Sequence, residues 1–228
     1  MAYRLKMVMA DGTTNELIQT EHDPKSKMAG IPSFSTCCLL NPACLKRMLD
    51  GLSVCAHCFS AALQKIRVGL KRTTSANYVV LNSQDIKTAP KVKWTRKALE
   101  INPGKLTRIE SFGDVGSVRQ ARNYLKIVKA NPDCRFAAWT KNLNFWVQAF
   151  KKDGKPFNLT LVFSSLNVNQ PDAIPEWALE WVDHRFTVYT KEWLEAHGVK
   201  SNCAGISCAT CQLCYHRGTA FDILEILR

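Results

Sequence analysis

From residue 105 onward the chain alternates between apolar runs and amphipathic stretches, and this alternation restricts the fold more than any other feature. The apolar runs are predicted strands at residues 106–112, 134–140, 158–165 and 185–190. The stretches that follow them are predicted helices at residues 117–130, 143–152, 171–183 and 191–197. Repeated strand–helix units form parallel sheets with crossover helices, and strands that are apolar on both faces lie inside such sheets.

We therefore expect an α/β fold, built as a partial or complete β/α (TIM-like) barrel; a doubly wound sheet fits the same pattern. The first half of the chain is less regular, with a short strand expected within residues 33–40 and a short helix near residues 93–100. We assign residues 1–200 to the barrel-like domain, which includes an N-terminal cysteine loop at residues 37–58. Residues 201–228 form a predicted C-terminal cysteine knot and tail.

Four cysteines near the C-terminus follow the spacing Cys-x4-Cys-x2-Cys-x2-Cys: Cys203, Cys208, Cys211 and Cys214. Crowded spacing of this kind is typical of iron–sulfur ligation, because a cubane takes four closely spaced thiolates. Structural zinc more often uses two Cys-x2-Cys pairs that lie a dozen or more residues apart. We therefore predict an iron–sulfur cluster of the 4Fe–4S type here, with a zinc-stabilised scaffold as the weaker alternative.

A second group of cysteines lies in the N-terminal loop and comprises Cys37, Cys38, Cys44, Cys55 and Cys58. Because adjacent residues seldom face one site together, we predict as ligands Cys38, Cys44, Cys55 and Cys58, or three of them. The chain has ten cysteines in all. Without an export signal this number indicates metal binding or redox chemistry rather than disulfides. Cys134, at the start of a predicted strand, is expected to be buried and inert.

The formal net charge of the chain is +12. A basic chain is attracted to phosphates, so nucleic acid is a candidate partner. The lysines and arginines are scattered, however, which is also the pattern of an ordinary solvated surface. No stretch approaches the roughly 18 apolar residues of a membrane helix, and the start of the chain lacks the apolar run of a signal peptide. We expect a soluble, cytoplasmic protein with no membrane partner.

The chain also resembles a family of small phage-encoded, cysteine-rich gene products. The resemblance runs from about residue 30 onward and depends on the order and spacing of several short segments. These segments are Thr36-Cys37, Cys58-Phe59-Ser60, Arg108-Ile109 with Gly113-Asp114, Phe136 with Thr140-Lys141, and Cys214-Tyr215. A phage origin implies that the protein works in the host cytoplasm.

This family in turn resembles divergent radical S-adenosylmethionine (SAM) enzymes, which place a cluster-binding loop after the first strand of a β/α barrel. The resemblance implies a catalytic cluster on Cys44, Cys55 and Cys58, and an auxiliary cluster on the C-terminal knot. It also implies that Gly113 and Asp114 contact SAM, in the manner of a Gly-Gly-Glu motif. The usual loop is Cys-x3-Cys-x2-Cys, whereas ten residues separate Cys44 from Cys55 here.

Two functions follow, and both include one or two iron–sulfur clusters. The first is a radical SAM-like enzyme, in which three thiolates leave one iron of the loop cluster free for SAM. The second is a non-catalytic iron–sulfur protein for electron transfer, redox sensing or association with nucleic acid, in which a fourth ligand closes that iron. An electron-transfer partner fits either function. The sequence leaves open whether the protein is an enzyme.

Overall fold

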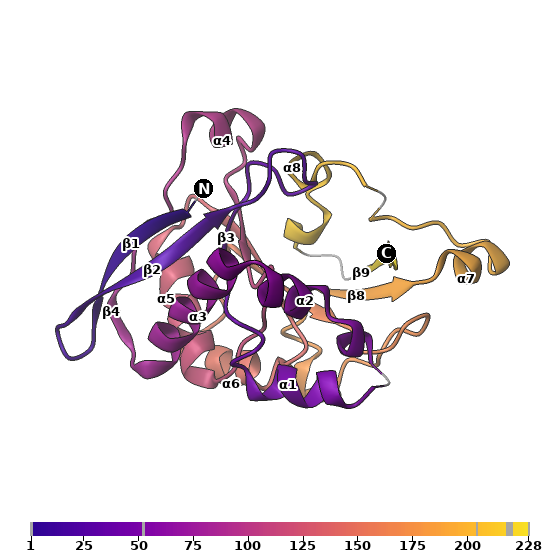
Figure 1. Ribbon diagram of the computed structural model, residues 1–228, viewed down its shortest axis with the longest axis horizontal. Coiled ribbons are helices and arrows are strands. Elements are labelled where there is room, and N and C mark those ends of the chain that lie inside the picture. Colours follow the sequence, from indigo (N-terminus) through magenta and orange to yellow (C-terminus); the bar gives the residue numbers. More distant parts are fainter. Residues whose placement is uncertain (1, 52, 204, 218–220, 228) are drawn as a thin grey trace.

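The predicted strand–helix units form the centre of a nine-stranded mixed sheet (Figure 1). The structure is a computed structural model that describes residues 2–51, 53–203, 205–217 and 221–227. The predicted strands appear as β5 (Leu106–Ile109), β6 (Arg135–Thr140), β7 (Leu159–Ser164) and β8 (His184–Tyr189). They pair in parallel in this order, with β3 (Pro32–Phe34) beside β5 and β9 (Phe221–Ile226) beside β8. The predicted α/β class is confirmed.

An antiparallel extension that the sequence analysis did not predict precedes the parallel strands. It consists of β1 (Ala2–Met9), β2 (Thr14–Glu21) and β4 (Ile86–Thr88). The β1–β2 turn contains Gly12, whose φ of 87° lies in the left-handed region that glycine tolerates best. The strand order of the whole sheet is β4-β1-β2-β3-β5-β6-β7-β8-β9.

The sheet is open, so the complete barrel considered above is not formed. Closing a barrel would require β9 to pair with the free side of β3. That side is already occupied by β2, which pairs with β3 in antiparallel fashion. The edge strands β4 and β9 therefore lie at opposite ends of the strand order, and they do not pair within the described residues.

Three helices cover one face of the sheet: α3 (Val68–Ser83), α5 (Val118–Ala130) and α6 (Leu143–Asp153). Ser117 caps α5 as predicted, because its side chain accepts a hydrogen bond from the Gln120 backbone N–H. Tyr124 of α5 stacks on Trp146 of α6, and both side chains are fully buried. Both belong to the largest of the apolar cores that the structure describes, where aromatic side chains bury large areas.

The opposite face of the sheet is covered by the C-terminal cysteine segment. It folds into α8 (Cys208–Cys211) and the 3₁₀ turn η3 (Leu213–Tyr215). Because strand side chains alternate, Leu161 of β7 points to the helix-covered core while Val162 points to this second face. Strand β9 follows the segment and joins the same sheet.

The remaining helices lie in the connections between strands. They are α1 (Pro42–Leu49), η1 (Val54–His57), α2 (Phe59–Ile66), α4 (Arg96–Ile101), η2 (Glu176–Ala178) and α7 (Lys191–Ala196). In the part of the chain that the structure describes, no helix has the length and apolar character needed to cross a membrane.

Two predicted elements differ from the structure. The strand predicted at 106–112 ends at Ile109, because Glu110 adopts a left-handed conformation with φ of 58°. The helix predicted at 171–183 is wrong, since this stretch forms only the short turn η2. Its prolines have no N–H to donate, and the Asp172 carboxylate instead accepts hydrogen bonds from the end of β7, at Leu166 and Asn167.

Candidate functional site

The four C-terminal cysteines line a single cavity on the second face of the sheet. Cys208 and Cys211 belong to α8, Cys214 belongs to η3, and Cys203 comes from the segment that precedes them. Apolar side chains of the sheet and of the loop before β3 complete the walls; Met28 and Ile223 are examples. The structure thus brings together all four residues of the predicted cluster site.

Backbone contacts fix these cysteines to distant parts of the chain. The Cys208 N–H donates to the Lys27 carbonyl over 2.6 Å, and the Cys203 N–H donates to the Leu224 carbonyl over 3.1 Å. Gln212 takes a left-handed conformation with φ of 55°, which lets the chain turn from α8 into η3. The cavity is therefore assembled from the loop near residue 27, from β9 and from the cysteine segment itself.

Two cations flank the thiols. The Lys27 Nζ lies 3.5 Å from the Cys203 Sγ and also contacts the Glu225 carboxylate. The Arg108 guanidinium lies over the Trp139 ring at 3.8 Å from its centroid and lines the same cavity. Burial lowers the pKa of Arg108, and the neighbouring Cys214 and Cys208 thiols act in the opposite direction. Positive charge is therefore placed where thiolates would gather.

Unpaired hydrogen-bond donors also border this cavity. Within the described residues, neither the Arg108 Nε nor the buried Tyr215 hydroxyl has a hydrogen-bond partner, and both residues line the cavity. Buried donors without partners are rare in folded proteins and often mark the place of a bound group. Burial raises the pKa of Cys214 to about 12 in the protein alone, with Arg108 opposing that rise.

The five N-terminal cysteines lie where the parallel strands end. Cys37 and Cys38 follow β3, Cys44 lies in α1, Cys55 lies in η1, and Cys58 is the N-cap residue of α2. The loop is joined to the end of β7 by the Val54 N–H, which donates to the Leu166 carbonyl over 2.8 Å. This is the edge of a parallel sheet at which functional groups gather in α/β proteins.

The four predicted N-terminal ligands interact with one another. A hydrogen bond between the Cys38 and Cys58 thiols raises the pKa of Cys38 and lowers that of Cys58 to about 6. Burial raises the pKa of Cys44 and of Cys55. The Cys55 thiol contributes to the rise at Cys44, and the Cys58 thiol contributes to the rise at Cys55. The fifth cysteine, Cys37, is buried like Cys38, and both thiols donate to the Gln64 side-chain oxygen, over 3.3 Å from Cys37 and 3.1 Å from Cys38.

Asp114 connects this group to the ends of β5 and β6. Its carboxylate accepts hydrogen bonds from the Thr140 hydroxyl (2.6 Å) and the Lys141 N–H (2.9 Å), and lies 3.5 Å from the Arg47 guanidinium. Burial lowers the pKa of Lys141, against the opposing effect of Cys55 and Asp114. Gly113 and Asp114, the predicted SAM contacts, therefore lie next to the cysteine loop, but the Asp114 carboxylate is already engaged by the protein.

Glu110 is a site residue that the sequence analysis missed. Its buried carboxylate accepts hydrogen bonds from the Thr36 N–H and hydroxyl, the Gln120 amide and the Tyr124 hydroxyl. It thereby attaches the start of the cysteine loop to α5. The sequence did contain a signal for this residue, because Glu110 is acidic and directly follows an apolar strand. The next buried apolar residue, Val115, comes five positions later.

Gly113 is required by close packing, and its replacement is our first prediction. A Cβ at this position would lie 2.4 Å from the Thr36 carbonyl and 2.7 Å from the Glu110 carboxylate. We expect Gly113→Ala to destabilise the protein by roughly 2–3 kcal/mol, because the backbone must shift to relieve the overlap. Urea unfolding measures this change.

The matched control is Gly69→Ala, in helix α3, where an added Cβ meets nothing within 4 Å. This change should be neutral or stabilising by up to about 1 kcal/mol. Equal unfolding midpoints for the two variants would contradict the close packing at Gly113.

Neither the C-terminal nor the N-terminal cysteine group is arranged to hold a single metal ion. Among the described residues, no three His, Cys, Asp or Glu side chains form a group that could hold a metal ion. A cubane distributes its ligands over four irons and so spaces them more widely than one zinc ion with Zn–S bonds of about 2.3 Å. Cys134 is buried in the helix-covered core, as predicted.

Comparison with known proteins assigns the chain to a family. A family model described as Gene product 88 matches residues 9–197, which is more than half of the chain. The match includes the whole N-terminal cysteine loop and ends before Cys203. No curated protein and no solved structure matches the chain. The expected relationship to phage-type gene products is confirmed at this level, and the chain belongs to the Gene product 88 family.

Proposed function

We propose that this protein holds a 4Fe–4S cluster in the C-terminal cavity and serves as an iron–sulfur protein. The observation that carries the proposal is the convergence of Cys203, Cys208, Cys211 and Cys214 on one cavity. No other residue type supplies four equivalent soft ligands of this kind, and thiolates are the usual ligands of such clusters.

The charges around the cavity support the same proposal. An oxidised cubane core carries two positive charges, so with four thiolates the bound cluster carries two negative charges. Lys27 and Arg108 supply two positive charges beside the thiols. The unpaired donors on Arg108 and Tyr215 would find acceptors in the sulfur atoms of a cluster, and such hydrogen bonds tune cluster potentials.

We infer a second cluster site at the N-terminal group, with Cys38, Cys44, Cys55 and Cys58 as its ligands. Four interacting thiols favour a cluster whose irons are all ligated by the protein. Each cluster would accept one electron from an external donor and pass it to an acceptor. On this view the parallel sheet is an opened β/α barrel that carries clusters for electron transfer or redox sensing.

A radical SAM enzyme is the second candidate function. The observation that favours it is the position of the N-terminal cysteine loop, which follows the first parallel strand, β3, and lies beside Gly113. The bonds that Asp114 makes to Thr140, Lys141 and Arg47 count against it, because they leave this carboxylate poorly available to the amino group of SAM.

Anaerobic purification tests the proposed function. We expect a brown protein with broad absorbance near about 400 nm, about eight irons and about eight sulfides per chain, and no zinc. About four irons would support one cluster rather than two. A colourless protein that contains zinc would overturn the proposal and establish a zinc-stabilised scaffold.

A separate assay distinguishes the two functions of the same protein. The fully loaded protein is mixed with SAM and dithionite, and 5′-deoxyadenosine is measured. We expect none, because four protein thiolates leave no iron open. Production of 5′-deoxyadenosine would contradict the electron-transfer proposal and support the radical SAM function. The assignment of the clusters would be unaffected.

A further inference from the structure

Helix α5 carries a row of cations on the side that faces away from the sheet. Arg119, Arg122, Lys126 and Lys129 follow one another at intervals of three, four and three residues, which places them on one side of the helix. Apolar and amide residues between them face the core. This spacing makes the row a continuous feature of the surface.

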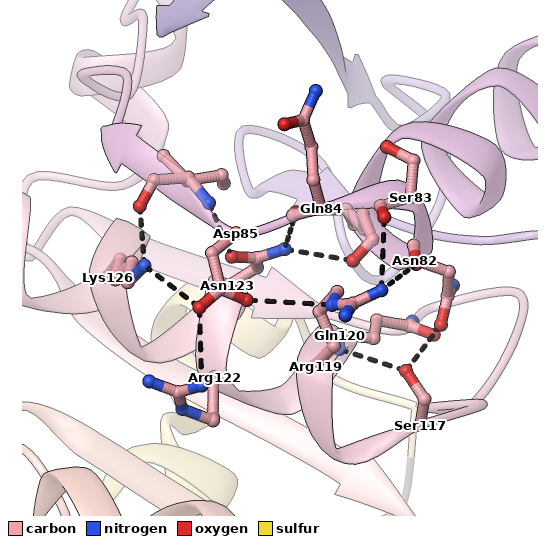
Figure 2. Close-up of polar contacts among 12 residues, drawn as sticks. Asn82, Ser83, Gln84, Asp85, Ser117, Arg119, Gln120, Arg122, Asn123 and Lys126 are labelled. Atoms are coloured by element: carbon pink, nitrogen blue, oxygen red, sulfur yellow. Dashed lines mark hydrogen bonds and ion pairs between the residues drawn. The ribbon is translucent and has the colours of Figure 1, made fainter. Parts of the chain in front are cut away.

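A single carboxylate serves three of these cations (Figure 2). The Asp85 carboxylate lies 3.6 Å from Arg119, 3.3 Å from Arg122 and 3.9 Å from Lys126. These contacts place the three side chains beside the start of β4. The Asp153 carboxylate also accepts a hydrogen bond from Arg122, over 2.7 Å, so two carboxylates face three cations and one positive charge is in excess at this point.

Neighbouring elements extend the row. The Lys91 Nζ bonds the Ala130 carbonyl at the end of α5, and the Lys129 Nζ bonds the Asp153 carbonyl at the end of α6. Lys151 and Lys152 precede Asp153 and are exposed. Lys126 also donates a hydrogen bond to the Ile86 carbonyl, which joins the row to β4.

We call this surface the α5 basic face. It comprises Lys91, Arg119, Arg122, Lys126, Lys129, Lys151 and Lys152. The carboxylates among or beside these seven side chains are Asp85, Asp153 and Asp11, the last of which contacts Gln84. The excess is therefore four positive charges, against +12 for the whole chain. Charge that looks scattered in the sequence is concentrated here by the fold.

We propose that the α5 basic face binds the phosphate backbone of double-stranded DNA. With 13 residues, α5 is about 20 Å long, and a duplex presents roughly a dozen phosphates over that length. Single strands are usually bound through stacking on exposed aromatic rings. Among the large exposed hydrophobic side chains of the described residues, the aromatic ones are Phe59 in α2, Phe157 after α6 and Trp177 in η2. None of them lies on α5, which favours a duplex.

The proposal is independent of the iron–sulfur sites. The α5 basic face lies on the helix-covered side of the sheet, whereas the C-terminal cavity lies on the other side. Loss of the C-terminal cluster should therefore leave DNA affinity unchanged, and failure of DNA binding would say nothing about the clusters.

The test uses fluorescence anisotropy with a labelled 30-base-pair duplex over a range of salt concentrations. The variant is Lys91→Gln with Lys151→Gln and Lys152→Gln, three exposed side chains. Each phosphate contact contributes about −0.9 to the slope of log K against log salt. We expect the triple variant to lose at least about tenfold in affinity near 0.1 M salt, and about 2.7 units of slope if each lysine contacts one phosphate.

The matched control removes the same charge elsewhere, through Lys46→Gln, Lys65→Gln and Lys71→Gln on helices α1 to α3, where all three side chains are exposed. This control should weaken binding by less than about twofold. No binding by the wild type, or equal loss in the two triple variants, would overturn the proposal. Tighter binding to a single strand of the same length would overturn its duplex preference.

Discussion

The double replacement Cys208→Ser with Cys214→Ser should remove about four irons per chain and leave the remaining iron in place. This prediction depends on the proposed C-terminal cluster. A serine hydroxyl is a poor ligand for iron at neutral pH, and two ligands out of four would be lost. Iron and sulfide counts after anaerobic purification, with the absorbance spectrum, measure the effect.

The same variant should also loosen the C-terminal segment. Cys208 and Cys214 pack against the apolar side chains of the second face, including Ile31 and Val162. A cluster would tie α8 and η3 to that face, because its ligands come from both elements and from Cys203. Without it we expect faster cleavage by trypsin after Lys200 and Arg217, while the helix-covered core stays resistant.

Cys134→Ser is the matched control, since it also exchanges a buried thiol for a hydroxyl. Cys134 lies in the helix-covered core, among residues such as Phe136. We expect this variant to keep all of its iron and to lose about 1–2 kcal/mol of stability, from burial of a hydroxyl. Equal iron contents in the control and the double variant would exclude Cys208 and Cys214 as ligands.

The parallel part of the sheet was predictable because its signals are local. Apolar runs mark β5 to β8, Ser117 marks the start of α5, and Asn131 marks its end, where it is the C-cap residue. The hairpin of β1 and β2 also carries a local signal, because Asp11-Gly12 joins the two strands and Leu5, Met7 and Met9 alternate with polar or less buried residues, but the sequence analysis missed it. Strand β4 carries no such signal, since it is short and its pairing with β1 joins residues as far apart as Val8 and Thr88. Such long-range pairing is not encoded in any single stretch of sequence.

The sequence identified the candidate ligands but not their surroundings. Cysteine spacing alone led to the eight thiols that the structure gathers in two places. The cations beside the C-terminal thiols could not be identified in the same way, because Lys27 lies 176 residues from Cys203 in sequence. Arg108 could have been noticed in the sequence, because a charged residue inside an apolar strand is costly to bury without a partner.

Closure of the sheet was unpredictable for a related reason. Whether a β/α array closes depends on what occupies the outer edge of its first strand. Here β2 pairs with β3 through Thr20 and Ser33, and again through Glu21 and Pro32. The pairing depends on the polar end of β2, and an irregular loop separates β2 from its partner β3. A pattern of apolar runs contains no information about this pairing.

Our last prediction concerns Glu110 and the pH dependence of stability. Burial raises the pKa of this carboxyl from 4.5 to about 7, against the opposing effect of its hydrogen bonds from Tyr124 and Thr36. Between these two pH values the folded protein keeps a proton that the unfolded chain has lost. The stability contributed by this proton is therefore present below about pH 4.5 and is lost as the pH rises through about 7.

Glu110→Gln removes this titration, so the comparison of wild type with variant isolates it. The variant starts with a penalty, because its amide cannot accept all the hydrogen bonds that Glu110 accepts. That penalty does not depend on pH. The stability of the wild type relative to the variant should fall by about 3 kcal/mol between about pH 5 and about pH 8.

Urea unfolding at four or five pH values measures this difference. Glu100→Gln, at an exposed carboxylate of α4 that pairs with Arg96, controls for the loss of a carboxylate as such. A difference between wild type and Glu110→Gln that stays constant across the range would contradict a raised pKa at Glu110. A difference that falls as the pH rises would mean that the Glu110 carboxyl is only partly ionised at neutral pH. The attachment of the cysteine loop to α5 depends on this carboxyl. The N-terminal group would then be held most firmly in mildly acidic solution, because the neutral carboxyl costs less to bury beside Thr36 than the carboxylate does.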